Sequence, residues 1–191
     1  MLPAEENFEQ GWLVREEAET DWDHGKRPEH RTTEEKLENG VVLLDKPAGP
    51  KSHEISVDVK KKLNLRKAGH SGTLDPDVTG VLPVGINSGT KVLDALKNAG
   101  KVYVGLMELG DEFTRDEIEK VAESFIGTVK QVPPEISAVK REERERDVYD
   151  VEIMEVENNE VLFRIECEKG FYVRTFCRQF GNRIGAEGEM T

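Results

Sequence analysis

A twelve-residue stretch from Gly69 to Gly80, GHSGTLDPDVTG, concentrates groups that can do chemistry. Its three glycines predict tight turns or close backbone approach, and the proline after Asp75 biases that aspartate toward an extended backbone. A carboxylate held in a loop between apolar elements can act as a nucleophile or a general base. Asp75 is therefore the candidate catalytic residue, although an Asx-turn explains an aspartate here equally well. For Asp77 the turn is the favoured interpretation.

Other chemistries compete for the same aspartates. The residues from Asp75 resemble the start of a calcium-binding loop, but the twelfth position is Ile86 where such loops need a glutamate, so that interpretation fails. They also match the DxDxT motif of phosphate-transferring haloacid dehalogenase enzymes. That motif directly follows an apolar strand, whereas here it follows His-Ser-Gly-Thr-Leu, which leaves a phosphotransferase as a weakly supported alternative. The stretch also lacks the Gly-Lys-Ser/Thr ending of a P-loop.

Metal and disulfide chemistry are not predicted. His24, His30 and His53 are interpreted as surface residues, without the ligand pattern of a metal site. Cys167 and Cys177 cannot build a disulfide framework or a Cys-x-x-Cys zinc site. The residues therefore predict no metal site.

Composition predicts a soluble protein. The 191 residues are 36% hydrophobic, and no apolar run approaches the ~20 residues of a membrane span. The first residues, MLPAEENFEQ, lack the basic and then apolar plan of a signal peptide, so we expect a cytoplasmic protein with no membrane partner.

The net charge of −12 is unevenly distributed and hides a basic middle segment. Residues 1–40 carry −7, residues 41–106 carry +4, and residues 107–191 carry −9. The densest basic part, Lys60 to Lys67, fits a solvated helix face if taken alone, and an anionic ligand if other features support one.

Apolar periodicity and turn signals predict strands and helices without regular βαβ alternation. Strands are expected over 41–44, 81–86, 102–109, 148–156 and 161–167, and helices after Ser52, over 90–98, after Thr114 and within 171–184. The first strand is expected to be buried, Ser52 to cap its helix, and Pro83 to mark an edge strand or a bulge. The pattern favours an α+β fold with a mixed, largely antiparallel central sheet flanked by helices.

Four segments in order resemble the TruB/dyskerin class of pseudouridine synthases. They are Gly40-Val-Val-Leu-Leu-Asp-Lys46-Pro47-x-Gly49-Pro50-x-Ser52-His53, Gly69-His70-Ser-Gly-Thr-Leu-Asp75-Pro76-x-x-Thr-Gly80-Val-Leu-Pro83, Gly100-Lys101-x-Tyr103-x-Gly105 and Gly170-x-Tyr172-Val173-Arg174-x-Phe. The stretch from Trp22 to Pro28 and the residues that follow Gln131 make the archaeal dyskerin-like catalytic subunit of H/ACA ribonucleoproteins the nearest match.

The resemblance implies an isomerase that detaches uracil from its ribose and reattaches it through carbon, without a cofactor or metal. It implies that Asp75 is the nucleophile, that Tyr103 stacks on the flipped base and assists proton removal, and that Arg174 pairs with the aspartate. The covalent route, through the sugar or through the uracil ring, is left open. The implied substrates are ribosomal RNA selected by an H/ACA guide RNA and the T-loop of tRNA.

The resemblance also implies residues that bind the substrate or support the site. His70 would help to hold the nucleotide out of the stack, and Lys46 and Pro47 would brace the active-site loop. The other expected substrate-binding residues are Lys101, Tyr172, Lys140 and Arg141. Small Nop-type and Gar-type H/ACA proteins are the implied protein partners.

Two parts of the chain are expected to differ in role. Residues 1–39 are expected to form an N-terminal extension, and residues 40–191 a catalytic domain that is incomplete at its C-terminal end. The family continues with a basic segment and a PUA RNA-binding domain, so the chain is expected to be either a fragment or the partner of a separate PUA chain. A non-catalytic scaffold subunit of an H/ACA-type ribonucleoprotein is the alternative function.

Overall fold

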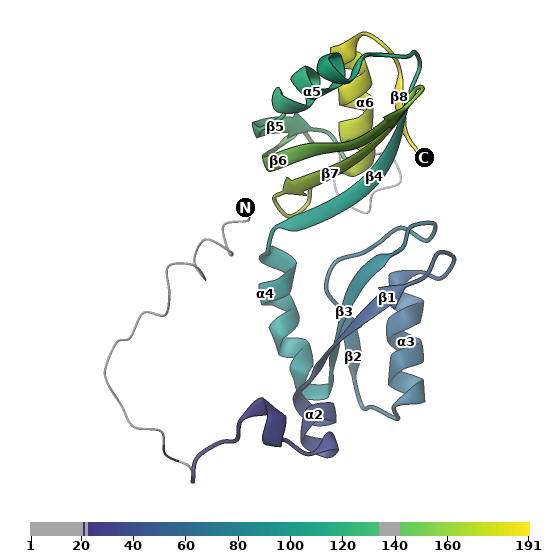
Figure 1. Cartoon of the computed structure of the whole chain (residues 1–191). Helices are drawn as coiled ribbons and strands as arrows, with labels where there is room; N and C mark the ends of the chain where they lie inside the picture. The colour runs from purple at the N-terminus through teal and green to yellow at the C-terminus, as the bar shows by residue number, and fades with distance from the viewer. Residues whose placement is uncertain (1–20, 22, 134–141) are drawn as a thin grey trace. The chain divides into compact units, whose positions relative to one another are not determined.

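The computed structural model describes residues 21, 23–133 and 142–191, and the chain divides into two compact units at Asn98 (Figure 1). Each unit has a sheet and a hydrophobic core of its own. Every strand pair in the described residues is antiparallel, so the α+β prediction is confirmed. The strands form two sheets, one in the N-terminal unit and one in the C-terminal unit.

The N-terminal unit is built on a three-stranded sheet in the order β1-β3-β2. The strands are β1 (Val41–Lys46), β2 (Ala68–His70) and β3 (Gly80–Ile86), and helix α3 (Ser52–Lys62) connects β1 to β2. Buried apolar side chains of β3 and of the turn after α3 form its core: Leu65, Leu82, Val84 and Ile86. The shorter elements are η1 (Pro28–His30), α2 (Thr33–Asn39), η2 (Asn87–Val92) and α4 (Leu93–Asn98).

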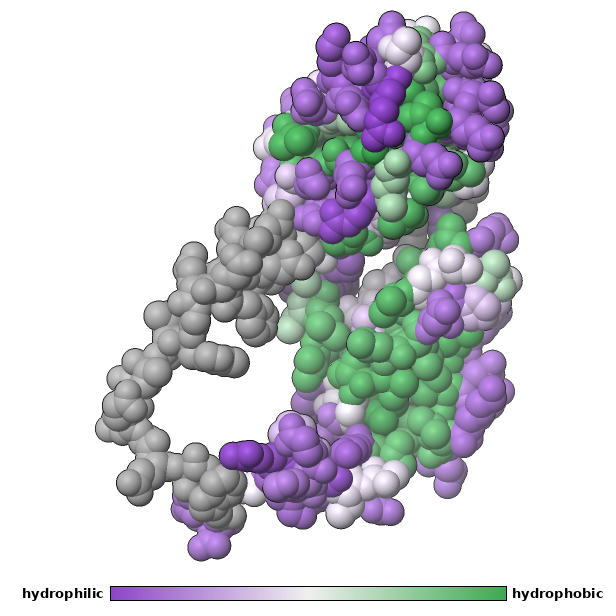
Figure 2. Space-filling model, viewed as in Figure 1, coloured by the Kyte–Doolittle hydropathy of each residue, from purple (hydrophilic) through white to green (hydrophobic). Residues whose placement is uncertain are grey.

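Three local predictions for this unit were wrong. The first strand is not buried throughout, because the side chains alternate between two faces and Leu43 is 69% exposed. The surface over this sheet is strongly apolar (Figure 2). Lys51, not Ser52, is the N-cap of α3, and the Glu54 carboxylate accepts a hydrogen bond from the Lys51 N–H. Pro83 lies in β3, the central strand of the sheet, and not in an edge strand. The pairing of β3 with β2 ends at the neighbouring residue, where His70 pairs with Val84, so that ladder requires no N–H from Pro83.

Helix α2 lies within the segment expected to be an extension and was not predicted. Leu37 is its single large apolar residue, so no helical period is visible. Its start is fixed by a capping box, in which Thr32 and Glu35 each accept a hydrogen bond from the backbone N–H of the other. The Asn87 side chain donates to the Leu37 carbonyl at 3.1 Å and attaches the helix to the end of β3.

The C-terminal unit is a five-stranded antiparallel sheet in the order β5-β6-β7-β4-β8, with helices α5 and α6 over one face (Figure 1). Its elements are β4 (Lys101–Leu109), α5 (Arg115–Glu123), β5 (Gly127–Gln131), β6 (Arg144–Glu157), β7 (Glu160–Cys167), α6 (Val173–Ile184) and β8 (Gly188–Met190). The predicted β6–β7 hairpin is confirmed, and Asn158 adopts the positive φ of 55° that its tight turn requires. The Thr114–Glu117 capping box predicted for α5 is also present.

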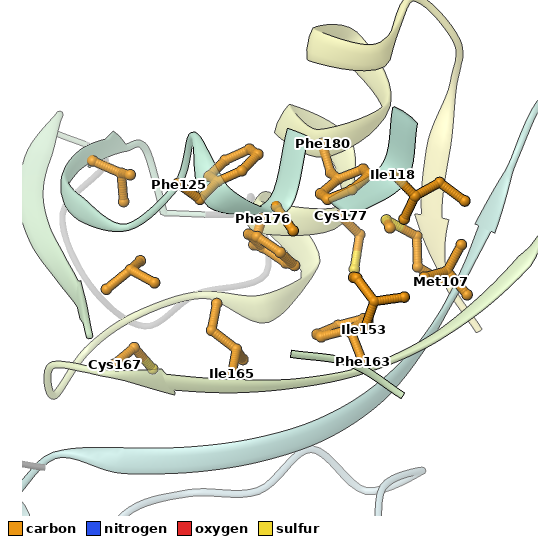
Figure 3. Close-up of a cluster of buried hydrophobic side chains, with 14 of the residues drawn as sticks. Met107, Ile118, Phe125, Ile153, Phe163, Ile165, Cys167, Phe176, Cys177 and Phe180 are labelled. Carbon is orange, nitrogen blue, oxygen red and sulfur yellow. The ribbon is translucent and has the colours of Figure 1, made fainter. Parts of the chain in front are cut away.

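Aromatic side chains fill the space between this sheet and its helices (Figure 3). The rings of Phe125 and Phe176 meet edge to face with centroids 4.8 Å apart, and Phe163 contributes a ring from β7. On β4, opposite Phe163, stands Gly105. A Cβ at this glycine would lie 2.7 Å from Phe163 Cζ, so the glycine leaves room for the aromatic core.

None of the helices in the described residues has the length and hydrophobicity that crossing a bilayer requires. The elements that carry the candidate site residues are β1, β2 and the loops that follow them in one unit, and β4 and the start of α6 in the other.

We predict that Gly105→Ala lowers the free energy of unfolding by about 1–3 kcal/mol, because the added methyl overpacks the core against Phe163. Urea denaturation followed by circular dichroism measures the change. Combining Gly105→Ala with Phe163→Leu should cost less than the sum of the two single changes, because the smaller side chain makes room for the methyl. Additive costs would contradict this packing account.

Candidate active site

The loop between β2 and β3, which carries Asp75, is held by a buried lysine. Lys46 is fully buried at the end of β1. Its Nζ donates hydrogen bonds to the carbonyl oxygens of Pro47 at 2.9 Å, Pro76 at 3.0 Å and Val78 at 2.9 Å. Because an ammonium group has three donors and no acceptor, these three carbonyls satisfy it completely. The lysine thus joins the turn after β1 to the residues that directly follow Asp75.

The residue before Asp75 is held from helix α3. The Ser52 hydroxyl accepts a hydrogen bond from the Leu74 N–H at 3.0 Å and lies 3.1 Å from the Leu74 carbonyl, to which it donates. The Gly49 N–H donates to the Pro76 carbonyl at 2.8 Å and adds a backbone link across the loop. Asp75 is itself exposed, between neighbours whose backbone groups are bonded to the scaffold. An aspartate in this position faces solvent from a fixed backbone.

His70, the last residue of β2, is anchored to the same helix. Its Nδ1 lies 2.9 Å from the hydroxyl oxygen of Ser56, which is buried. Burial of the half-exposed ring, and to a smaller degree the nearby His53, lower the pKa of His70 below its ordinary value. The ring is therefore neutral at pH 7, because its ordinary pKa is already below 7.

Strand β4 of the C-terminal unit carries Tyr103 and Lys101. Tyr103 packs against the aromatic core, and burial raises the pKa of its phenol to about 12. Lys101 stands opposite Cys167 on β7, and its Nζ donates to the Ala99 carbonyl at 2.6 Å. Partial burial lowers the pKa of Lys101. The phenol thus stays protonated at neutral pH, in a mostly apolar setting.

The segment that leads into α6 is clamped by a buried glutamine. Gln131, at the end of β5, accepts a hydrogen bond from the Tyr172 N–H at 2.9 Å and donates through Nε2 to the Tyr172 carbonyl at 3.2 Å. Its side chain is 2% exposed. Arg174 follows in the first turn of α6. The clamp fixes the direction in which the helix, and with it the arginine, begins.

The predicted site residues therefore fall into two groups. The first group lies in the N-terminal unit, in or next to the β2–β3 loop: Lys46, Pro47, His70 and Asp75. Lys46 bonds the carbonyls of Pro47 and Pro76, and His70 bonds Ser56 of α3. The second group lies in the C-terminal unit on β4 and at the start of α6: Lys101, Tyr103, Tyr172 and Arg174. Lys140 and Arg141 lie outside the described residues, as do Trp22 and Pro134.

Sequence reasoning missed the roles of Ser56 and Gln131. Ser56 is one helical turn after Ser52, which places both hydroxyls on one face of α3, and that spacing was the available signal. Gln131 appeared only as part of a motif, and nothing in its neighbours indicated burial. No group of three or more His, Cys, Asp or Glu side chains in the described part of the chain is arranged to hold a metal ion.

The fold is that of a pseudouridine synthase. A crystal structure of a Cbf5-Nop10-Gar1 complex contains a chain that matches with a TM-score of 0.87 and 48% identity, over 92% of this chain and 54% of the other. A structure of an H/ACA ribonucleoprotein bound to a substrate RNA containing 2′-deoxyuridine matches with a TM-score of 0.82 and 44% identity, over 92% and 52%.

The family model of the TruB family pseudouridylate synthases (N terminal domain) matches residues 60–115 and 111–173. The chain belongs to this family. The DKCLD (NUC011) domain model matches residues 2–56 and thus runs across the boundary expected at residue 40.

Several curated relatives come from archaea. A probable tRNA pseudouridine synthase B of Pyrococcus furiosus is 46% identical over 192 residues, which are 100% of this chain and 56% of the relative. Its counterpart in Methanothermobacter thermautotrophicus is 47% identical over 94% of this chain and 55% of the relative. The chain thus spans about half the length of the curated relatives it matches.

We predict that Lys46→Met lowers the free energy of unfolding by about 3 kcal/mol, because three partly buried hydrogen bonds to backbone carbonyls are lost while the apolar stem is kept. Urea denaturation measures the loss. Lys60→Met is the matched control: this lysine is exposed, and its replacement should change stability by no more than about 0.5 kcal/mol. Equal stability of both variants would show that Lys46 does not hold the loop.

We predict that Tyr103→Phe reduces the loss of stability at alkaline pH. The pKa of Tyr103 is about 12 in the folded chain and has its ordinary value of 10 in the unfolded chain. As the pH rises above 10, the unfolded state ionises first, so the contribution of this group is present below pH 10 and is lost toward pH 12. Unfolding free energies of both proteins between pH 9 and 12 measure the difference, and parallel curves would contradict the burial of the phenol.

Proposed function

We propose that this chain isomerises uridine to pseudouridine in RNA and that Asp75 is the nucleophile. The observation that carries the proposal is the loop itself. Asp75 is exposed, yet the residues on both sides of it are hydrogen-bonded to Ser52 and Lys46. A nucleophile must reach its substrate from a fixed position, and this loop meets both conditions.

The reaction is a rearrangement and balances without an oxidant or reductant. The bond between N1 of uracil and C1′ of ribose breaks, and a bond between C5 and C1′ forms. C5 loses a proton, and N1 gains one. A carboxylate can assist by adding transiently to either C1′ or the uracil ring, and the present geometry is compatible with both routes.

Arg174 is proposed to pair with Asp75 in the assembled site. The first turn of a helix carries the positive end of its dipole, which disfavours a guanidinium unless an anion offsets it. A carboxylate partner supplies that anion, and the guanidinium in turn favours the ionised form of the carboxyl. The clamp between Gln131 and Tyr172 would set the direction of approach.

Tyr103 is proposed to stack on the base that has left the RNA stack. A pKa of about 12 leaves almost no phenolate at neutral pH, so the ring acts as an aromatic surface and a hydrogen-bond donor. Proton removal from C5, which the resemblance also assigns to this residue, would need the phenolate form, and burial disfavours that form. The extrahelical base costs a few kcal/mol to unstack, and stacking on an aromatic ring repays part of that cost.

The substrates and partners of the relatives guide the remaining proposals. We propose ribosomal RNA selected by an H/ACA guide RNA as the substrate, tRNA as a second one, and Nop-type and Gar-type proteins as partners. One relative is named a probable tRNA pseudouridine synthase B, and the solved relatives are a Cbf5-Nop10-Gar1 complex and an H/ACA ribonucleoprotein bound to a substrate RNA. The family resemblance suggests ribosomal RNA and the guide RNA. The exposed lysines at the end of α3, together with Lys140 and Arg141, would contact phosphates. His70, Lys101 and Tyr172 would contact the substrate. Residues 40–191 would form the catalytic part, after an extension over 1–39, in a cytoplasmic particle.

We predict that Asp75→Asn lowers the rate of pseudouridine formation by about 10⁴-fold or more, as removal of a covalent nucleophile does in other enzymes. Product is measured with guide RNA, substrate RNA, the Nop-type and Gar-type proteins and a separately supplied PUA domain. Asp77→Asn is the matched control, since it removes an exposed carboxylate two residues away and should keep the activity.

Equal product from wild type and Asp75→Asn would contradict the assignment of the nucleophile. Binding of the partner proteins without product from the wild type, even with the PUA domain present, would indicate the scaffold function instead.

A further inference from the structure

Ser56 makes two contacts that together determine where the proton of a histidine lies. Its hydroxyl is buried at 3% exposure, donates a hydrogen bond to the Ser52 carbonyl at 3.1 Å and lies 2.9 Å from His70 Nδ1. A hydroxyl carries one proton, and a carbonyl oxygen can only accept. With that proton directed to Ser52, the hydroxyl oxygen must accept from the ring.

We infer that Ser56 is a positioning residue that holds His70 in the tautomer with the proton on Nδ1, so that Nε2 is unprotonated. The hydrogen bond made by one ring nitrogen of a neutral histidine decides the state of the other. Because Nδ1 is occupied by Ser56, Nε2 is the nitrogen that a ligand can use. In water the neutral side chain favours the opposite tautomer, so the protein selects the less common one.

The backbone next to His70 is fixed as well, which keeps the ring in reach of Ser56. The Ser71 N–H donates to the Pro83 carbonyl at 3.0 Å, and the Ser71 hydroxyl donates to the Leu93 carbonyl at 3.1 Å. His70 pairs with Val84 in the β2–β3 ladder. The ring is therefore set by the strand on one side and by α3 on the other.

The tautomer restricts what His70 can bind at neutral pH. An unprotonated Nε2 accepts a hydrogen bond and cannot donate one to a phosphate. In an RNA, its partner would be a hydrogen-bond donor, either a ribose 2′-hydroxyl or an N–H group of a base. This consequence rests on the proposed function, whereas the tautomer itself does not.

The test is a two-bond proton–nitrogen correlation spectrum of the full 191-residue chain, labelled with ¹⁵N, at pH 8. The pattern separates the two neutral tautomers, and a His70→Gln variant assigns the signals of this ring among the four histidines. We expect wild-type His70 to show the proton on Nδ1. Ser56→Ala should shift the ring toward Nε2 protonation, and Ser56→Thr, which keeps the hydroxyl, should restore the wild-type pattern.

Ser71→Ala is the matched control, because it removes the hydroxyl of the residue next to His70, and that hydroxyl donates to the Leu93 carbonyl. It should leave the His70 pattern unchanged. A wild-type His70 protonated on Nε2, or a Ser56→Ala spectrum identical to wild type, would overturn the inference. If Ser56→Ala does not fold, the wild-type spectrum decides alone, and none of these outcomes depends on catalytic activity.

Discussion

A single buried ammonium group determines the shape of the loop that carries Asp75. Lys46 has no exposed surface, and its ammonium group donates hydrogen bonds to three backbone carbonyls. These carbonyls lie in loops, where no helix or strand supplies an N–H partner. Two of these carbonyls belong to prolines, whose segments lack the N–H groups needed to build a ladder. Moving a charge out of water is costly, and here each proton of the charge is matched by an oxygen. The loop therefore keeps one conformation without regular secondary structure.

This constraint allows Asp75 to be exposed and yet held in place. Ser52 holds the peptide before it, and Lys46 holds the peptides after it. A second serine on the same face of α3 reaches His70. One short helix thus supplies the contacts that order both a candidate nucleophile and its neighbour in the motif. Preorganisation of this kind reduces the entropy that is lost when a substrate is bound in a reactive geometry.

Much of the fold could be predicted, because the elements with a clear apolar period or an explicit cap formed as expected. The Thr114–Glu117 capping box and the Asn158 hairpin turn are local signals that act at short range. Helix α2 was missed because Leu37 is its one large apolar side chain and no helical period is visible, although its Thr32–Glu35 capping box is a local signal. The central position of Pro83 depends on where β2 ends, which is a tertiary fact.

The sequence motifs named candidate site residues and one of their supports, Lys46, but two other supports were missed. The motifs pointed to Asp75 and Lys46, yet the hydrogen bonds of Ser56 and Gln131 join residues 14 and 41 positions apart. No local pattern encodes contacts over such separations. Burial of these two polar side chains becomes understandable only when their partners are known, since an isolated buried polar group would be destabilising.

The central claim is that the loop is ordered before any RNA binds, and amide hydrogen exchange of the chain alone tests it most directly. Leu74 and Gly49 both lie outside any helix or strand. The Leu74 N–H donates to the Ser52 hydroxyl, and the Gly49 N–H donates to the Pro76 carbonyl. We expect both amides to exchange as slowly as the paired amides of β3. Exchange of both at the rate of an unstructured loop would contradict the claim.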